Sequence, residues 1–238
     1  MFDLLQQSAL MRSHARSGKI VFGINHELRD FATARKKVLD LVIARPAGEA
    51  TTETLVDLAR RYHVALDAAQ RRTLATLPPL RRAPVGAVLM ALEAKAAMTE
   101  HVKALPRLYD ELNSSHQTVH GASRQALAVG LVMVNASPTF VSPDLNKTPG
   151  MPVVVSEHKQ PAAAAAVVAK LREIPRRTGS STEGYDGLGV IVISAANDGT
   201  TAVSLVTSRP APAPGDIFYY DNMVTRIAHE YDTAFASI

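Results

Sequence analysis

The 238-residue sequence contains no cysteine. A disulfide framework, an iron–sulfur cluster, a thiolate zinc site and a cysteine nucleophile are therefore all excluded. Long apolar runs are missing too, because the longest, residues 126–134, falls far short of the ~20 residues that span a bilayer. The N-terminus lacks the charged start and apolar centre of a signal peptide. We therefore expect a cytoplasmic protein without a membrane partner.

Aromatic residues are scarce, at 5% of the chain, and tryptophan is absent. Proteins that bind single-stranded nucleic acid usually stack its bases on aromatic side chains, so this shortage argues against reading of unpaired bases. A chain of this composition that binds nucleic acid would hold the phosphates, with salt-sensitive and largely sequence-independent affinity. Duplex RNA, which is recognised through its shape and backbone, fits this mode at least as well as single strands.

Basic residues are in excess, with a net charge of +4, but they are unevenly distributed. Residues 1–125 carry 18 Lys and Arg against 12 Asp and Glu, whereas residues 126–238 carry 8 against 10. Arginine predominates, and its planar guanidinium suits phosphate oxygens. A solvated helical face is the alternative interpretation. The residues that we predict to bind nucleic acid, RNA in preference to DNA, are Arg35, Lys36, Lys37, Arg60, Arg61, Arg71, Arg72, Arg81 and Arg82.

Three of these arginines, Arg60, Arg71 and Arg82, follow one another at intervals of eleven residues. On one continuous helix such a step rotates by only about 20°, which would align them in a basic stripe. Pro78 and Pro79 forbid a single helix through all three. The arginines can therefore converge only if tertiary packing brings them together. If they do, replacing Arg60, Arg61, Arg71 and Arg72 by alanine should weaken binding to every sequence alike.

The spacing of apolar residues predicts an α+β fold, with a mostly helical N-terminal half and a small β-sheet with flanking helices in the C-terminal half. We expect a basic helical region over residues 1–113 and an α/β region over 122–238, or else one continuous domain. Between them, residues 113–122 read as a loop. In the first half, one short extended segment is expected at 20–24, and the predicted helices are 2–10, 25–44, 52–62, one from Asp67 to before Pro78, and one from Pro84 that Pro106 kinks or splits.

The second half alternates between short apolar runs and turn residues. Residues 127–134 are either a buried helix or a strand. Further predicted elements are a strand at 151–156, a helix at 162–172, a strand at 188–194, a hairpin turn at 197–199 with its return strand at 201–207, and a final helix capped by Asp221. A proline-rich arm, residues 209–215, precedes that helix. The helix then docks either on a neighbouring subunit, giving a homo-oligomer, or on its own domain.

The sequence contains only weak motifs for catalysis or for metal and cofactor binding. His116 and His120 are four residues apart, and Glu111 or Asp110 could complete an imidazole–carboxylate site, but the surrounding Ser and Gly residues indicate a loop. We therefore predict no metal and no cofactor. Residues 184–189 are glycine-rich but precede a strand, which indicates a turn rather than a dinucleotide fingerprint. No phosphate-binding loop, zinc-protease motif or nucleophile elbow occurs.

The favoured hypothesis is a non-enzymatic, sequence-independent nucleic-acid-binding protein that self-associates as a coat or packaging protein. The combined content of alanine (37), serine (15) and proline (14) resembles that of the proline-alanine-serine-rich proteins of polymycoviruses. This resemblance in composition implies coating of double-stranded RNA. One alternative is a structural oligomer or adaptor without nucleic acid. The other is an enzyme of unrecognised family with a site in the C-terminal half, at His158, Asp186 and Tyr219.

Overall fold

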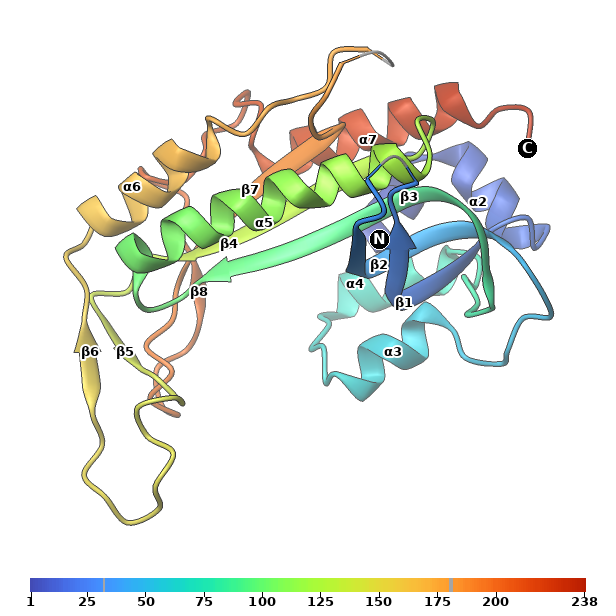
Figure 1. Cartoon of the computed structure of the whole chain (residues 1–238). Coiled ribbons are helices and arrows are strands. Elements are labelled where there is room, and N and C mark those ends of the chain that lie inside the picture. The colour runs from blue at the N-terminus through green and yellow to red at the C-terminus, as the bar shows by residue number, and fades with distance from the viewer. Residues whose placement is uncertain (32, 180–181) are drawn as a thin grey trace.

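The computed structural model describes residues 1–31, 33–179 and 182–238, and a six-stranded mixed sheet lies at its centre (Figure 1). The strands lie in the order β1-β2-β3-β4-β7-β8. β1, β2 and β3 form an antiparallel meander, β3, β4 and β7 run parallel, and β8 returns antiparallel to β7. The strands are β1 Val21–Arg29, β2 Lys36–Pro46, β3 Val85–Ala97, β4 Leu127–Asn135, β7 Gly187–Ser194 and β8 Ser204–Leu205; a separate small sheet pairs β5 Thr139–Val141 with β6 Val155–Glu157.

Helices cover both faces of the large sheet. On one face α5 and α6 bury a core that includes Leu112, Val132 and Val167. On the other face α1, α2 and α7 bury a second core that includes Leu5 and Ile227. The helices are α1 Phe2–Gln7, α2 Ala9–Arg16, α3 Leu55–Arg61, α4 Ala68–Thr76, α5 His101–Ala122, α6 Ala162–Leu171 and α7 Tyr220–Ala234. The result is a three-layer α/β/α arrangement.

The prediction of a mostly helical N-terminal half with an α+β fold is wrong, because that half supplies three of the six strands of the large sheet, including the two longest. Residues 25–44 form most of the β1–β2 hairpin, and residues 85–97 form β3. β3 is an inner strand, and its successive residues Leu89, Met90 and Ala91 are all buried. A strand covered on both faces shows no apolar–polar alternation, so its apolar spacing was mistaken for that of a helix.

Several elements that depend on local signals are confirmed. The predicted helix at 2–10 is helical but divides at Ser8 into α1, residues 2–7, and α2, which runs on to residue 16, and α6 lies within the predicted 162–172. Both α3 and α4 begin with a capping box, in which Thr54 pairs with Asp57 and Asp67 pairs with Gln70. Strand β7 matches the predicted 188–194 closely. The ambiguous residues 127–134 form a strand, β4.

Helix α5 continues through residues 113–122, which were predicted as a loop. Pro106 lies in the second turn of this helix, and the helix continues past it. Strand β3, from the first half of the chain, pairs in parallel with β4 from the second half. The two predicted regions therefore share one sheet, and α5 is the crossover that joins the parallel strands.

Helix α7 packs on the chain's own sheet. Ile227 is fully buried, and a Cβ atom on Gly187 would lie 2.7 Å from its Cγ1 atom. Glycine at this position lets the helix approach β7 closely. Of the two predicted docking modes, the structure shows the helix on its own domain. Among the helices of the described residues, none is long and apolar enough to cross a membrane.

Candidate functional site

The large sheet forks between β2 and β3. Leu41 and Leu92 are the last pair of facing residues in this antiparallel ladder. Beyond them, residues 36–39 of β2 stay paired with β1, while residues 93–97 of β3 stay paired with β4. Asp40 stands at the fork, and its Oδ2 atom accepts the backbone N–H of Ala94 at 2.7 Å. The Asp40 carboxylate thus accepts a hydrogen bond from a backbone N–H of β3 that no longer pairs with the backbone of β2.

Glu93 is the first residue of β3 beyond the fork. Its side chain is only 3% exposed, on the face of the sheet that α5 covers. Its Oε1 atom lies 2.7 Å from Nζ of Lys95 and 3.8 Å from Nζ of Lys37. The Oε2 atom is buried and has no hydrogen-bond partner among the described residues. An unpaired carboxylate oxygen in such a place is costly and marks a position for an additional cation or donor.

Helix α5 packs over these charged side chains and contributes further contacts to them. Nζ of Lys95 also lies 3.1 Å from the Oε2 atom of Glu111, which in turn binds Arg107. Nζ of Lys37 donates to the backbone carbonyl of Glu111 at 2.6 Å and contacts Oγ of Ser114 at 3.2 Å. The fork, two lysines and one turn of α5 therefore form one charged site, here called the fork site and defined by Asp40, Glu93, Lys95, Lys37 and Glu111.

Period-two alternation along β3 explains why Glu93 and Lys95 lie together. Residues two apart on a strand point to the same face. Ala91 and Ala97, which precede and follow this pair at the same spacing, belong to the core beneath α5. Their small side chains leave room for the longer Glu93 and Lys95. The local sequence thus places a carboxylate and an ammonium group side by side beneath the helix.

Burial and ion pairing set the protonation of the fork site. Burial raises the pKa of Glu93, an effect that the bond to Lys95 partly offsets. Burial lowers the pKa of Lys37, which the nearby Glu93 carboxylate partly restores. For Lys95 burial is the largest single effect and lowers the pKa, but hydrogen bonds to Glu93 and Glu111 outweigh it and raise the pKa overall. Lys95 is thus held as a cation.

The fork site has the donor set for a hard divalent cation. Mg²⁺ is typically bound by one or two carboxylates, with waters and substrate phosphates completing its shell. Asp40 and Glu93 supply two carboxylates from neighbouring strands, and Oε2 of Glu93 lacks any other partner among the described residues. The described residues contain no group of three or more His, Asp or Glu side chains placed to hold a metal.

The predicted arginine pairs do not form one stripe. Arg60 pairs with Asp57, while Arg61 and Arg82 both pair with Glu53. Arg60 and Arg71 line a cavity of about 450 Å³ between α3 and α4.

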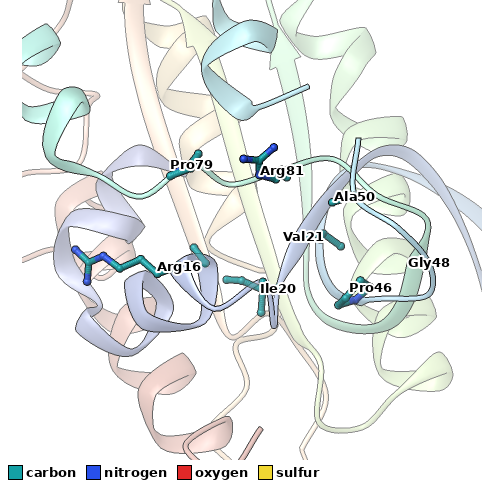
Figure 2. Close-up of a pocket in the computed structure, with 10 residues that line it drawn as sticks. Arg16, Ile20, Val21, Pro46, Gly48, Ala50, Pro79 and Arg81 are labelled. Atoms are coloured by element: carbon teal, nitrogen blue, oxygen red, sulfur yellow. The ribbon is translucent and has the colours of Figure 1, made fainter. Parts of the chain in front are cut away.

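Arg81 lies across a different cavity, of about 340 Å³, from Arg16 (Figure 2). Arg72 is exposed on α4. Of the basic triplet, Lys36 pairs with Glu27 and Lys37 belongs to the fork site. Arg35 lines a third cavity, beside α5.

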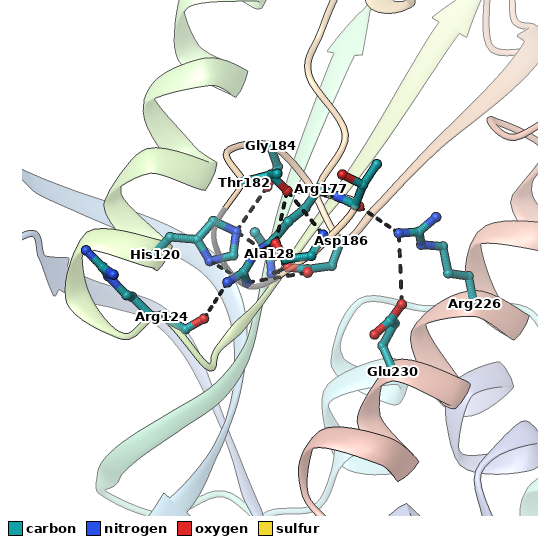
Figure 3. A network of polar contacts seen from close by, with 11 residues as sticks. His120, Arg124, Ala128, Arg177, Thr182, Gly184, Asp186, Arg226 and Glu230 are labelled. Atoms are coloured by element: carbon teal, nitrogen blue, oxygen red, sulfur yellow. Dashed lines mark hydrogen bonds and ion pairs between the residues drawn. The ribbon is translucent and has the colours of Figure 1, made fainter.

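His116 and His120 lie in α5 and not in a loop. His120 contacts the Gly184 carbonyl through Nε2 at 3.0 Å, and its Nδ1 lies 3.2 Å from a guanidinium nitrogen of Arg177 (Figure 3). Asp186 accepts the backbone N–H of Ala128 at 2.7 Å and lies 3.5 Å from both His120 and Arg177. Burial lowers the pKa of both histidines, to about 4 for His116. They are therefore neutral at neutral pH.

The three residues proposed for an enzyme site in the C-terminal half lie apart. Asp186 binds Ala128, at the start of β4. Nδ1 of His158 lies 2.8 Å from the carbonyl oxygen of Ser137, beyond the opposite end of β4. A strand of this length separates them by roughly 25 Å, at about 3.3 Å per residue. Tyr219 is the N-cap residue of α7. These residues do not form one site.

Sequence reasoning missed Asp40, Glu93 and Lys95. The available signal was the spacing Glu93-Ala94-Lys95, which places both side chains on one face only if the segment is a strand. A helix, as predicted there, would turn them about 200° apart. Asp40 carries no local signal at all, because its relation to Glu93 depends on the pairing of β2 with β3.

Comparison with family models, curated proteins and solved structures finds no match for this chain. The chemistry of the fork site therefore follows from its own geometry.

Proposed function

We propose that the protein hydrolyses phosphodiester bonds in nucleic acid with a divalent cation bound at the fork site. The observation that carries this proposal is the arrangement of Asp40 and Glu93 at the point where β2 and β3 separate, with Lys95 beside Glu93. Two carboxylates, one exposed (Asp40) and one buried (Glu93), with a lysine beside the buried one, are suited to metal-assisted phosphoryl chemistry.

Each residue has a distinct part in this chemistry. The carboxylates of Asp40 and Glu93 would hold the cation, which would supply Lewis-acid polarisation of the phosphate and a more acidic water. In the overall reaction water would add to phosphorus, the bond from phosphorus to the leaving oxygen would break, and the water's proton would pass through solvent to the leaving oxygen. Lys95, which its ion pairs keep protonated, stabilises the negative charge that develops on the phosphate.

Nucleic acid is the substrate that the rest of the chain favours. The first 125 residues carry the basic excess, and polyanions are attracted to such a surface. The scarcity of aromatic side chains supports contacts to the backbone in place of contacts to bases. The proposal therefore keeps the hypothesis of sequence-independent nucleic-acid binding, with RNA or DNA as substrate.

The proposal departs from two sequence-based expectations, namely a protein without enzymatic activity and a protein without metal. Both were based on the lack of a recognised catalytic or metal-binding motif in the sequence, and the fork site contains no such motif. The coat-like hypothesis, in which the protein binds RNA and self-associates, stays as the competing one and predicts binding without turnover.

The test is cleavage of plasmid DNA and of duplex and single-stranded RNA with Mg²⁺ or Mn²⁺. We expect Asp40→Asn and Glu93→Gln each to lower the cleavage rate by about 100-fold or more, the scale seen when one preorganised charged group is removed. Asp144→Asn, a similar change at an exposed residue, serves as the control. If the parent binds nucleic acid but cleaves none of these substrates with either metal, the proposal is wrong and the coat-like hypothesis is favoured.

A further inference from the structure

We infer that a basic groove at the C-terminal end of α5 binds the phosphate backbone on one side of the bond to be cleaved. This inference rests on the proposed function, in that it takes nucleic acid as the substrate. The groove consists of two adjoining cavities, of about 490 and 280 Å³, which share Arg124 and Arg177. Its arginines are Arg35, Arg124, Arg177 and Arg226.

Two of these arginines are available to a ligand. Arg35 and Arg124 are exposed, and neither has a carboxylate partner among the described residues. They come from different parts of the fold, since Arg35 precedes β2 and Arg124 follows α5. Guanidinium groups that approach from two sides can bind one phosphate by paired hydrogen bonds. This cavity is also lined by Gln117, whose side-chain amide adds a neutral donor, and by Thr33 and Thr182, whose hydroxyls already donate to Asp30 and to the Gly179 carbonyl.

The other two arginines build the floor of the groove. Arg177 is 6% exposed and donates to the Arg124 carbonyl at 2.7 Å, which fixes the chain after α5 (Figure 3). Arg226 reaches from α7 to the Arg177 carbonyl at 2.8 Å. This network orders the wall that carries Arg124, so the wall is formed before a ligand binds.

Acidic residues also line the groove, but most of them are engaged. Asp30 accepts hydrogen bonds from the hydroxyl and backbone N–H of Thr33. Asp186 accepts the N–H of Ala128 and faces Arg177, and Glu230 lies 3.9 Å from Arg226. Glu183 is the exposed one. The exposed charge of Arg35 and Arg124 therefore exceeds the exposed negative charge.

The groove adjoins the fork site. Arg35 is two residues from Lys37, whose ammonium group belongs to the fork site. On α5, Lys37 contacts Ser114, and the groove begins with His116 and Gln117, less than one turn further along. One turn of helix advances about 5.4 Å. A nucleic-acid strand with one phosphate at the fork site can thus place a neighbouring phosphate between Arg35 and Arg124.

The test is the affinity for a fluorescent 20-base-pair RNA duplex and the matching DNA duplex, measured by anisotropy in EDTA at several salt concentrations. We expect Arg35→Ala/Arg124→Ala to weaken binding to both at least 10-fold at low salt. If each arginine makes one phosphate contact, the slope of log affinity against log salt should fall by about 1.8, at ~0.9 per contact. Lys147→Ala/Arg209→Ala, which removes the same charge from exposed positions of the second half, should bind as the parent does.

One further variant and a check of folding guard against loss of structure. Arg124→Gln alone should reproduce part of the weakening, and circular dichroism with thermal unfolding should match the parent for every variant compared. Equal binding by the Arg35/Arg124 and Lys147/Arg209 double variants would overturn the inference. So would a parent that binds heparin or anionic vesicles but neither duplex.

Metal-free binding separates this inference from the proposed function. A parent that binds in EDTA through Arg35 and Arg124 but cleaves nothing with metal supports the groove and contradicts the hydrolase. A parent that cleaves, with the double variant binding and cleaving as well as its charge-matched control, supports the hydrolase and contradicts the groove.

Discussion

A divalent cation at the fork site should stabilise the folded protein, and Asp40→Asn should remove that stabilisation. The unfolded chain does not hold Asp40 and Glu93 near each other, because their proximity depends on the pairing of β2 with β3. A cation that binds both carboxylates therefore binds the native state alone. By linkage, its binding free energy then adds to the free energy of unfolding.

The expected size follows from mass action. At a free metal concentration ten times its dissociation constant, the native state gains about 1.4 kcal/mol. For a chain of this length each kcal/mol moves the melting temperature by roughly 2–4 °C, so saturating metal should raise it by about 3–6 °C. In Asp40→Asn the amide oxygen can still accept the Ala94 N–H, so the variant itself should lose only about 1 kcal/mol without metal.

The assay is thermal unfolding with 0 to high-millimolar MgCl₂ or MnCl₂, at constant ionic strength set by NaCl. The parent and Asp144→Asn should show the rise, and Asp40→Asn and Glu93→Gln should not. A rise of equal size in Asp40→Asn would refute the assignment of this carboxylate as a ligand. No rise in the parent with either metal would refute the metal site itself, whatever activity the protein shows.

Three further outcomes are expected. Acid should destabilise the fold through His116. Burial holds the pKa of this histidine at about 4 in the native state, against an ordinary value of 6.5. As the pH falls below 6.5, only the unfolded chain gains the proton, so the free energy of unfolding decreases between pH 6.5 and pH 4. The loss should be about 2 kcal/mol by pH 5. Urea unfolding should show a flatter pH dependence for His116→Gln, while His229→Gln, at an exposed residue, should keep the dependence of the parent. Ile227→Ala should lower the free energy of unfolding, measured in urea, by about 3 kcal/mol, because it truncates a fully buried side chain that packs against β7. Ile217→Ala, at a half-exposed position, should lower it much less. Equal losses in the two variants would contradict the packing of α7 on its own sheet. Replacing Arg60, Arg61, Arg71 and Arg72 by alanine should reduce the salt slope of nucleic-acid binding by at most about 1.8, since Arg60 and Arg61 already pair with Asp57 and Glu53; a reduction near ~3.6 would show that all four contact phosphates.

The ion pairs around Glu53 and Asp57 show that three of the predicted arginines, Arg60, Arg61 and Arg82, already have carboxylate partners. Counting charges gives the net excess of a segment but not which cations already have partners. Arg61 and Arg82 are twenty-one residues apart and share one carboxylate. In contrast, Arg124 was not among the predicted binding residues, although it is exposed beside a cavity. Surface charge becomes available to a ligand only where tertiary contacts leave it unpaired.

Local signals in the sequence determined the parts of the fold that need only neighbouring residues. The caps at Thr54 and Asp67 define where α3 and α4 begin, since they satisfy free N–H groups within one turn. The run of branched residues at 188–194 and the turn at 197–199 specify β7 and the return of the chain toward β8. The absence of cysteine likewise excluded whole classes of site without reference to any structure.

Tertiary structure alone decided the identity of β2 and β3 and, with it, the candidate site. Strands covered on both faces carry continuous apolar residues, so the period that separates strand from helix is hidden in the sequence. Asp40 and Glu93 are more than fifty residues apart in the sequence. They lie near each other because the ladder of β2 and β3 pairs the adjacent residues Leu41 and Leu92 and ends there. A register between distant strands is set by packing of the whole sheet against its helices, which no local pattern encodes.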